Sequence, residues 1–335
     1  MSALETAFTR QVGVRIPLIC GAMYPCSNPE LVAAVSKAGG VGVFQPLSLV
    51  YVHGHDYREG IRLMKRLAGD RPLGMNVLTE RSSKTYAERM EKWVDIALEE
   101  GVRFFVSSLG NPRWIVDRAR AVGGVVYHDV TERKWALKAL DGGVQGLIGV
   151  NARAGGHAGP KTAQQLLDEL GDLGVPLVCA GGVGTAREFA DALRMGYAAV
   201  QMGTRFIATT ECVTHPDYKD AILRAEEDDI VLTERITGVP VAVIRTPYVE
   251  RIGTRAGPIA RWMLRGRRTK HWMRTFYGLR SLRQFKKGLF EGGSSAEYWQ
   301  AGRSVAGIDA IEPAGEIVRR FAAEAERVLV ESPTR

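Results

Sequence analysis

The fold of this chain is decided by one stretch near its middle, Gly146-Leu147-Ile148-Gly149-Val150, and by the loop that follows, Asn151-Ala152-Arg153-Ala154-Gly155-Gly156-His157. The first five residues form an apolar run that is typical of a short buried strand. The loop consists mostly of small residues and holds one histidine, and its glycines let the backbone adopt φ > 0 and approach a ligand closely. The stretch therefore predicts a strand of an α/β protein with a candidate binding loop at its end.

Two later stretches have the same organisation. Leu177–Ala180 is an apolar segment that precedes Gly181-Gly182 and a helical pattern over 186–195, and Ala199–Gly203 precedes Thr204. Glycine loops that lead from a strand into a helix present backbone N–H groups to a phosphate. We therefore expect these two loops to bind a phosphate, with the Thr204 hydroxyl adding a hydrogen bond. Tight turns without a ligand are the alternative explanation of the same glycines.

Apolar segments recur about 20 to 30 residues apart, which is the length of a strand, a crossover helix and two loops. We expect eight strands, at Ile16–Cys20, Val41–Gln45, Leu73–Val77, Phe104–Ser107, Val125–Asp129, Gly146–Val150, Leu177–Ala180 and Ala199–Gly203. Helical patterns lie between them, at Asn28–Ala38, Tyr57–Leu67, Tyr86–Glu100, Pro112–Val122, Glu132–Leu140, Ala163–Leu170 and Ala186–Met195. This alternation predicts an α/β fold, a (β/α)8 TIM barrel, rather than an open doubly wound sheet. An open sheet of this kind would favour a Gly-x-Gly-x-x-Gly fingerprint after its first strand. This sequence has none at that position.

The alternation stops after Phe206. We expect residues 1–208 and 310–335 to form the barrel, with Ile311–Val328 as its eighth helix, and residues 209–309 to form a small, mainly helical subdomain that covers the substrate site. The subdomain contains Arg261–Lys287, where ten Lys or Arg residues occur without an Asp or Glu. Such a basic block could attract nucleic acid, an acidic carrier protein or a phosphorylated substrate.

Composition narrows the class of protein. Hydrophobic residues make up 45% of the 335 residues, and no apolar run approaches the ~20 residues of a membrane span. The N-terminal residues lack the apolar core of a signal peptide, so we expect a cytoplasmic protein. The four cysteines have no zinc-binding spacing, and no metal site is expected from the His, Cys, Asp and Glu positions.

Functional residues of a TIM barrel lie at the carboxyl ends of its strands. His157 lies at such an end after paired glycines, and we expect it to be catalytic because imidazole suits proton transfer at neutral pH. Asn76 ends another strand in apolar surroundings, where its amide needs a partner, either a flavin ring edge or a loop carbonyl. Adjacent strand residues point to opposite faces, so His128 and Asp129 cannot both face one ligand. We assign His128 as the one that assists the cofactor.

The motifs together resemble the nitronate monooxygenase family. The resemblance lies in Ala154-Gly155-Gly156-His157, in Ala180-Gly181-Gly182, and in Gln201-Met202-Gly203-Thr204-Arg205-Phe206 with Glu211-Cys212. Gly21-Ala22-Met23 is similar to the family's N-terminal motif, and the resemblance resumes at residues 300–304. It implies an FMN-dependent TIM barrel with His157 as the active-site acid or base. It further implies FMN contacts from Ala22, Met23, Asn76, Gly155, Gly156, Ala180, Gly181, Gly182, Gly203 and Thr204.

Three functions are compatible with these observations. The leading one is an FMN-dependent enzyme that oxidises alkyl nitronates or nitroalkanes with O2, in which His157 removes the α-proton of a neutral nitroalkane. The second is a reductase in which NAD(P)H reduces FMN and an enoyl thioester or a quinone is then reduced. The third is a nucleic-acid-binding protein using the basic block, which we disfavour because an exposed helix face is the commoner explanation of such charges. We expect a small-molecule or acyl thioester substrate, no nucleic acid and no membrane span, and we allow for a homodimer.

Overall fold

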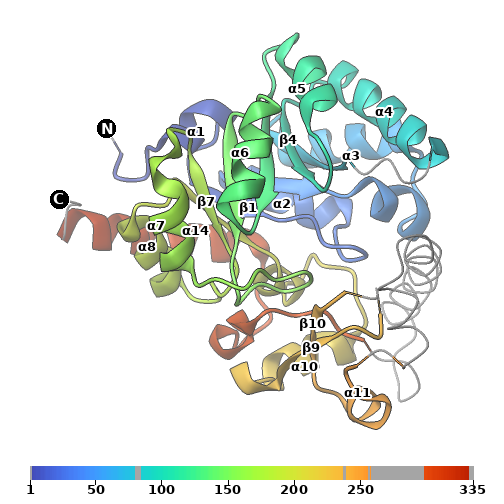
Figure 1. Ribbon diagram of the computed structural model, residues 1–335, viewed down its shortest axis with the longest axis vertical. Coiled ribbons are helices and arrows are strands. Elements are labelled where there is room, and N and C mark those ends of the chain that lie inside the picture. The colour runs from blue at the N-terminus through green and yellow to red at the C-terminus, as the bar shows by residue number, and fades with distance from the viewer. Residues whose placement is uncertain (1, 80–83, 237–238, 256, 258–297, 332–335) are drawn as a thin grey trace.

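The computed structural model describes residues 2–79, 84–236, 239–255, 257 and 298–331, and the ribbon in Figure 1 follows them from blue to red. Eight parallel strands pair in chain order, and the eighth pairs with the first, which closes the sheet into a barrel. The strands are β1 (Leu18–Cys20), β2 (Val41–Phe44), β3 (Leu73–Leu78), β4 (Phe104–Ser108), β5 (Val125–Val130), β6 (Gly146–Val150), β7 (Leu177–Ala180) and β8 (Ala199–Met202). The predicted TIM barrel is therefore confirmed.

The barrel interior is filled by side chains at alternate strand positions. Val41 and Val43 of β2, Phe104 of β4 and Tyr127 of β5 belong to one buried apolar cluster. The helix α1 (Ala7–Val12) contributes Phe8, whose ring lies edge-on to Phe104 at 5.8 Å and to Tyr127 at 5.7 Å. Because α1 closes the amino-terminal end of the barrel, the carboxyl ends of the strands are left for the functional loops.

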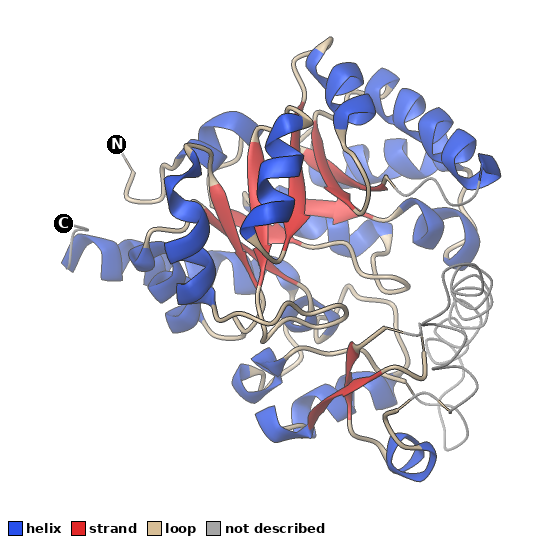
Figure 2. Cartoon of the chain, in the orientation of Figure 1, coloured by secondary structure: helices blue, strands red, loops and turns tan. Residues whose placement is uncertain are grey.

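Helices surround the sheet on its outer face, as Figure 2 shows in blue around the red strands. They are α2 (Pro29–Ala38), α3 (Tyr57–Ala68), α4 (Lys84–Glu99), α5 (Arg113–Arg120), α6 (Arg133–Asp141), α7 (Ala163–Leu170) and α8 (Ala186–Met195). The last helix, α14 (Ala314–Glu331), packs against α8 and α2, and its Phe321 ring lies 5.8 Å from that of Phe189. This helix therefore fills the eighth outer position, after the insertion that follows β8.

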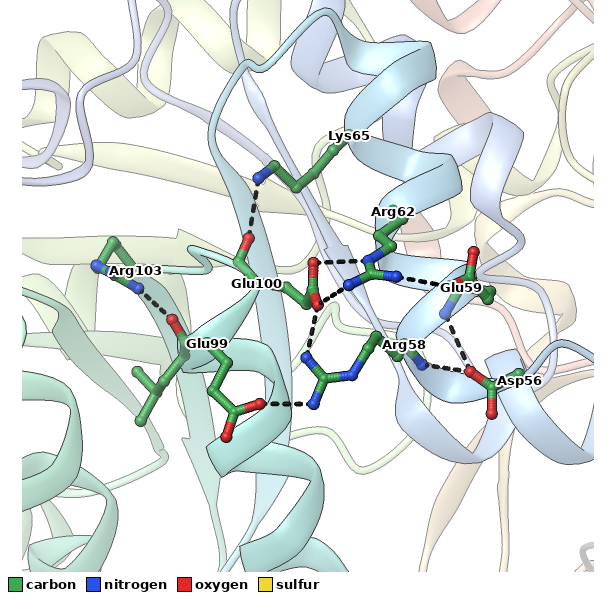
Figure 3. A network of polar contacts seen from close by, with 9 residues as sticks. Asp56, Arg58, Glu59, Arg62, Lys65, Glu99, Glu100 and Arg103 are labelled. Carbon is green, nitrogen blue, oxygen red and sulfur yellow. Dashed lines mark hydrogen bonds and ion pairs between the residues drawn. The ribbon is translucent and has the colours of Figure 1, made fainter.

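Ion pairs join two of the outer helices. Arg58 on α3 contacts Glu99 at 2.5 Å and Glu100 at 2.6 Å, and Arg62 contacts Glu100 at 3.0 Å, as Figure 3 shows. The two guanidinium groups lower the pKa of the Glu100 carboxyl, which is the least exposed member of the network. The network holds the end of α4 against α3.

The insertion after β8 contains a small sheet that the sequence did not predict. The antiparallel strands β9 (Ile230–Thr233) and β10 (Val241–Ile244) lie below the barrel in Figure 1, with α10 (Pro216–Arg224) and α11 (Pro247–Ile252) beside them.

Short helices also occur along the rest of the chain, at η1 (Ser48–Val52), η2 (Gly171–Leu173), α9 (Thr204–Ile207), η3 (Glu227–Asp229) and η4 (Arg303–Gly307). The basic block 261–287 lies outside the described residues, so its predicted role is not addressed by the structure.

The predicted elements agree closely with the observed ones. Each of the eight predicted strands overlaps an observed strand, although β1 begins at Leu18 rather than Ile16. The predicted helices between strands are α2 to α8, with ends that differ by one or two residues at most positions. The α1 plug and the η1 turn were not predicted, because neither is long enough to show a helical period.

Candidate active site

The loop after β6 is held by a segment from much later in the chain. The N–H of Ala242 in β10 donates to the carbonyl of Gly156 at 2.8 Å, and the N–H of Arg303 donates to the carbonyl of Arg153 at 3.0 Å. A Cβ at Gly302 would lie 2.5 Å from the backbone nitrogen of Gly155, so the two glycine backbones are in direct contact. The loop that carries His157 is thus fixed by both the β9–β10 sheet and the Gly302 segment.

The paired glycines after β7 are required by contacts with the same loop. Gly181 has φ 115° and Gly182 has φ 78°, a region that L side chains rarely adopt. A Cβ at Gly181 would lie 2.5 Å from Asn151 Oδ1, and one at Gly182 would lie 2.5 Å from Arg153 Nε. Asn151 also donates from Nδ2 to the Gly181 carbonyl at 2.9 Å. These glycines therefore have a packing reason, which is independent of any ligand.

Backbone donors nonetheless remain available at these loops. The N–H groups of Gly182, Gly203 and Thr204 have no acceptor among the residues that the structure describes. The Thr204 Oγ1, expected to face a phosphate, accepts a hydrogen bond from the Gly302 N–H at 2.9 Å, which leaves the hydroxyl proton available. The loops after β7 and β8 thus present several donors from which a phosphate could accept hydrogen bonds.

The arginines near these loops are engaged elsewhere. Arg153 donates from Nη1 to both carboxylate oxygens of Glu227 at 2.8 and 2.9 Å, and Arg303 contacts the same carboxylate at 3.2 Å. Arg205 is 1% exposed and donates to the carbonyls of Ala208 and Ala310. A ligand at the β7 and β8 loops would therefore meet backbone N–H groups rather than these three guanidinium groups.

Three polar side chains occupy inward positions at the carboxyl ends of the strands. Asn76 on β3 lies opposite Val106 of β4 in the register, and Val106 is part of the interior cluster. Asp129 follows the interior residue Tyr127 by two positions, and Gln201 packs beside Gly21, where an added Cβ would lie 3.0 Å from it.

These three side chains lack partners within the described chain. Asp129 Oδ1 and Gln201 Oε1 are buried and without a hydrogen-bond partner, and the Asn76 side chain forms no hydrogen bond with another described residue. Orphaned buried polar atoms are rare in folded proteins, because each costs free energy. Their position at the open end of the barrel indicates that a ligand supplies the missing partners.

His128 does not join this group. It lies on the opposite face of β5 from Tyr127 and Asp129, where its Nδ1 is 2.8 Å from Ser107 Oγ. Burial lowers the pKa of the His128 imidazole to about 4, so it is neutral at physiological pH. The inward polar residue of β5 is therefore Asp129, and His128, which was assigned to assist the cofactor, lies on the opposite face of the strand.

His157 lies at the end of the β6 loop, in the segment bonded to Ala242. Burial lowers the pKa of its imidazole, because the charged form loses its solvation there. The ring is therefore neutral at pH 7 and able to accept a proton.

Among the predicted N-terminal residues, Met23 packs beside Gly203, where an added Cβ would lie 3.4 Å from the Met23 Sδ. Ala22 borders the interior cluster, and Ala180 ends β7 on the same inward face.

Sequence reasoning missed three residues that the structure places here. Asp129 and Gln201 were recognisable as inward positions only with the correct strand register, since a shift of one residue reverses the face. Gly302 was noted as part of a motif without a role, and no local pattern reveals its contact with Gly155.

Within the described ranges, no helix is long and apolar enough to cross a membrane, and no three His, Cys, Asp or Glu side chains form a metal site.

The comparisons with known proteins agree with this geometry. A family model described as nitronate monooxygenase matches residues 5–324. The chain is 30% identical over 304 residues to a (3aS,4S,5R,7aS)-5-hydroxy-7a-methyl-1-oxo-octahydro-1H-indene-4-carboxyl-CoA dehydrogenase of Rhodococcus jostii, covering 90% of this chain and 82% of that protein. It is 26% identical over 276 residues to a nitronate monooxygenase of Pseudomonas aeruginosa, covering 69% and 77%.

A solved structure extends the comparison to three dimensions. FabK from Thermotoga maritima superposes with a TM-score of 0.78 at 26% identity, and the match covers 98% of each chain. The family match spans most of the chain and includes the barrel, the β6 loop and the segment around Gly302. The chain therefore belongs to the nitronate monooxygenase family, whose members are flavin-dependent oxidoreductases, and is itself an enzyme of that class.

Proposed function

We propose that the chain binds FMN at the carboxyl end of the barrel and acts on an acyl-CoA thioester. The observation that carries this proposal is the 30% identity to a carboxyl-CoA dehydrogenase over nine tenths of the chain, because that relative matches through both the barrel and the insertion. The sequence alone had favoured a nitronate as the substrate, with an enoyl thioester as the alternative. The proposal reverses that order.

The residues present fit FMN. The N–H groups of Gly182, Gly203 and Thr204 are suited to its phosphate, and nearby side chains do not compete for them. The orphaned Asp129 Oδ1 and Gln201 Oε1 are suited to the polar edge of an isoalloxazine ring, which offers both an N–H group and carbonyl oxygens. We propose the FMN contacts from Ala22, Met23, Asn76, Gly155, Gly156, Ala180, Gly181, Gly182, Gly203 and Thr204 that the resemblance implies, add Asp129 and Gln201, and leave out His128.

His157 is the proposed acid or base. Bound FMN supplies a centre that exchanges a hydride with carbon, which no protein side chain can do. The proton at the carbon next to a thioester carbonyl is acidic, and a neutral imidazole can accept it or can donate a hydrogen bond to the carbonyl oxygen. Burial keeps His157 in the required neutral form at pH 7.

The charges around the site support an uncharged reacting group. Arg153 and Arg303 are paired with Glu227, and Arg205 is buried against carbonyls, so these cations are not directed to a substrate. A thioester carbonyl is neutral and needs no such cation, whereas a nitronate is an anion that gains from one. The charges of the described loops and the similarity to the carboxyl-CoA dehydrogenase thus favour the same substrate class.

Nitronate oxidation is the second candidate. The match of the family model over residues 5–324 and the similarity to the Pseudomonas aeruginosa enzyme favour it. In that reaction His157 would remove the α-proton of a neutral nitroalkane, and a preformed nitronate would not need this step. NAD(P)H would be needed only if the enzyme reduces an enoyl thioester, because the flavin must then first be reduced by an electron donor.

Spectroscopy of the purified protein tests the proposal. We expect a flavin absorbance spectrum and release of a compound with the mass of FMN. Under anaerobic conditions, the holoprotein is mixed separately with a saturated acyl-CoA, with its 2-enoyl counterpart after reduction by NAD(P)H, and with an alkyl nitronate. Flavin bleaching by the saturated acyl-CoA, or reoxidation by the enoyl-CoA, supports the thioester proposal. Bleaching by the nitronate alone would replace it with the second candidate, and a colourless protein that cannot take up FMN would refute both.

A further inference from the structure

Asp129 is a carboxyl group at the inner end of the candidate site. It lies on the inward face of β5, two residues beyond Tyr127, which fills the barrel interior. Its Oδ1 is buried and has no hydrogen-bond partner among the described residues, although the residue as a whole retains partial exposure. A buried carboxyl oxygen without a donor is costly, so its persistence at the open end of the barrel points to a ligand.

The neighbours of Asp129 do not neutralise it. Inward positions on the adjacent strands are occupied by Val106 and Ser108 on β4 and by Ile148 and Val150 on β6. Tyr127 lies two positions earlier on β5 with a pKa raised by burial, and His157, whose pKa is lowered by burial, also lies at the carboxyl end of the barrel. Burial raises the pKa of the Asp129 carboxyl to about 7, and no cation among the described residues counters that effect.

We propose that Asp129 hydrogen-bonds the bound flavin and takes up a proton when the flavin is reduced. This inference rests on the proposed function, because it requires FMN in the barrel. Two-electron reduction at neutral pH gives the flavin a negative charge after it accepts one proton. An ionised carboxylate beside that charge in a site of low polarity is repelled, and a second proton, bound by Asp129, removes the repulsion. In the protonated form the carboxyl also becomes a donor to the ring edge.

Two measurements on the holoprotein test the inference, and neither depends on turnover. The visible spectrum of the oxidised flavin is titrated from pH 5 to pH 9, and the flavin midpoint potential is measured over the same range with dithionite as the reductant. The wild type should show a spectral step with a midpoint near neutral pH. Above that midpoint its potential should fall more steeply with pH than in Asp129→Asn, by about 30 mV per pH unit, which is the effect of one further proton per two electrons.

Matched variants assign the effect to this carboxyl. Asp129→Asn should lose the spectral step and the extra slope, and Asp129→Glu should retain a step at a changed pH. Asp117→Asn removes an exposed carboxyl on α5 and should behave as the wild type. If Asp129→Asn does not fold, the wild type and Asp129→Glu still decide, since identical titrations with no step in either would overturn the inference.

The outcomes separate this inference from the proposed function. A protein that binds FMN while Asp129→Asn retains the wild-type step and slope would refute the role of Asp129 alone. A protein that takes up no FMN would refute the proposed function and, with it, this inference.

Discussion

Replacing Asp129 by Asn should stabilise the flavin-free protein, and only at high pH. Burial raises the pKa of the folded-state carboxyl from an ordinary value of 3.8 to about 7. Between those values the folded state holds a proton that the unfolded state has released, so stability falls as pH rises through this range. A tenfold change in proton affinity is about 1.4 kcal/mol, and the difference therefore corresponds to about 4 kcal/mol of lost stability above pH 7. Asn has the same shape and no charge, so it avoids this cost.

Urea unfolding of the flavin-free protein provides the measurement. At pH 8.5, Asp129→Asn should exceed the wild type in unfolding free energy by about 2 to 4 kcal/mol, the lower figure allowing for water that enters the open site. At pH 4.5 the two should agree to within about 1 kcal/mol, since the carboxyl is then neutral in the folded state. Asp117→Asn is the matched control and should change little at either pH. Equal stabilities of wild type and Asp129→Asn at pH 8.5 would show that the carboxyl is solvated and that its pKa is ordinary.

Three further substitutions test other parts of the structure. His157→Ala should retain FMN, while the rate of flavin reduction by its substrate falls by about 10² to 10⁴, as measured in stopped flow; loss of the flavin instead would make His157 a cofactor ligand. Gly302→Ala should destabilise the protein by about 1 to 3 kcal/mol in urea unfolding, because its Cβ would lie 2.5 Å from the Gly155 nitrogen. An unchanged unfolding midpoint would contradict that contact. Glu100→Gln should lower stability at pH 7 by roughly 1 kcal/mol through loss of the pair with Arg58, and this difference should disappear once the pH falls below the lowered pKa of Glu100. A difference that persists at acidic pH would assign it to packing.

The barrel could be predicted from the sequence because its signals are local and repeated. Each strand is a short apolar run, and each is followed by a helical pattern, so an error in one element leaves the count of units unchanged. The glycine loops after β7 and β8 also lie where the sequence placed them, and their predicted role in binding a phosphate stays a prediction. The match between β7, β8 and the expected segments follows from these features.

The details of the site were less accessible. His128 and Asp129 are adjacent, so a shift of one residue in the strand register decides which of the two side chains faces the barrel interior. The residue types of a six-residue strand do not determine that register. The β9–β10 sheet was missed because each strand has only four residues, and the further partners of β10, the β6 loop and the segment around Gln300, lie far away in the sequence. Thr204 was expected to bind a ligand through its hydroxyl, but that oxygen also accepts from Gly302, a contact without any local sequence pattern.

The contact between Gly155 and Gly302 has a consequence for how the protein is made. The β6 loop emerges from the ribosome long before the segment that holds it in place, and the strand β10 that bonds to Gly156 also emerges later. A nascent chain that ends before Gly302 contains all eight barrel strands, but the loop with His157 then lacks its contacts with Gly302 and Arg303. The β6 loop should therefore reach its final conformation only after the segment that contains Gly302 has been synthesised.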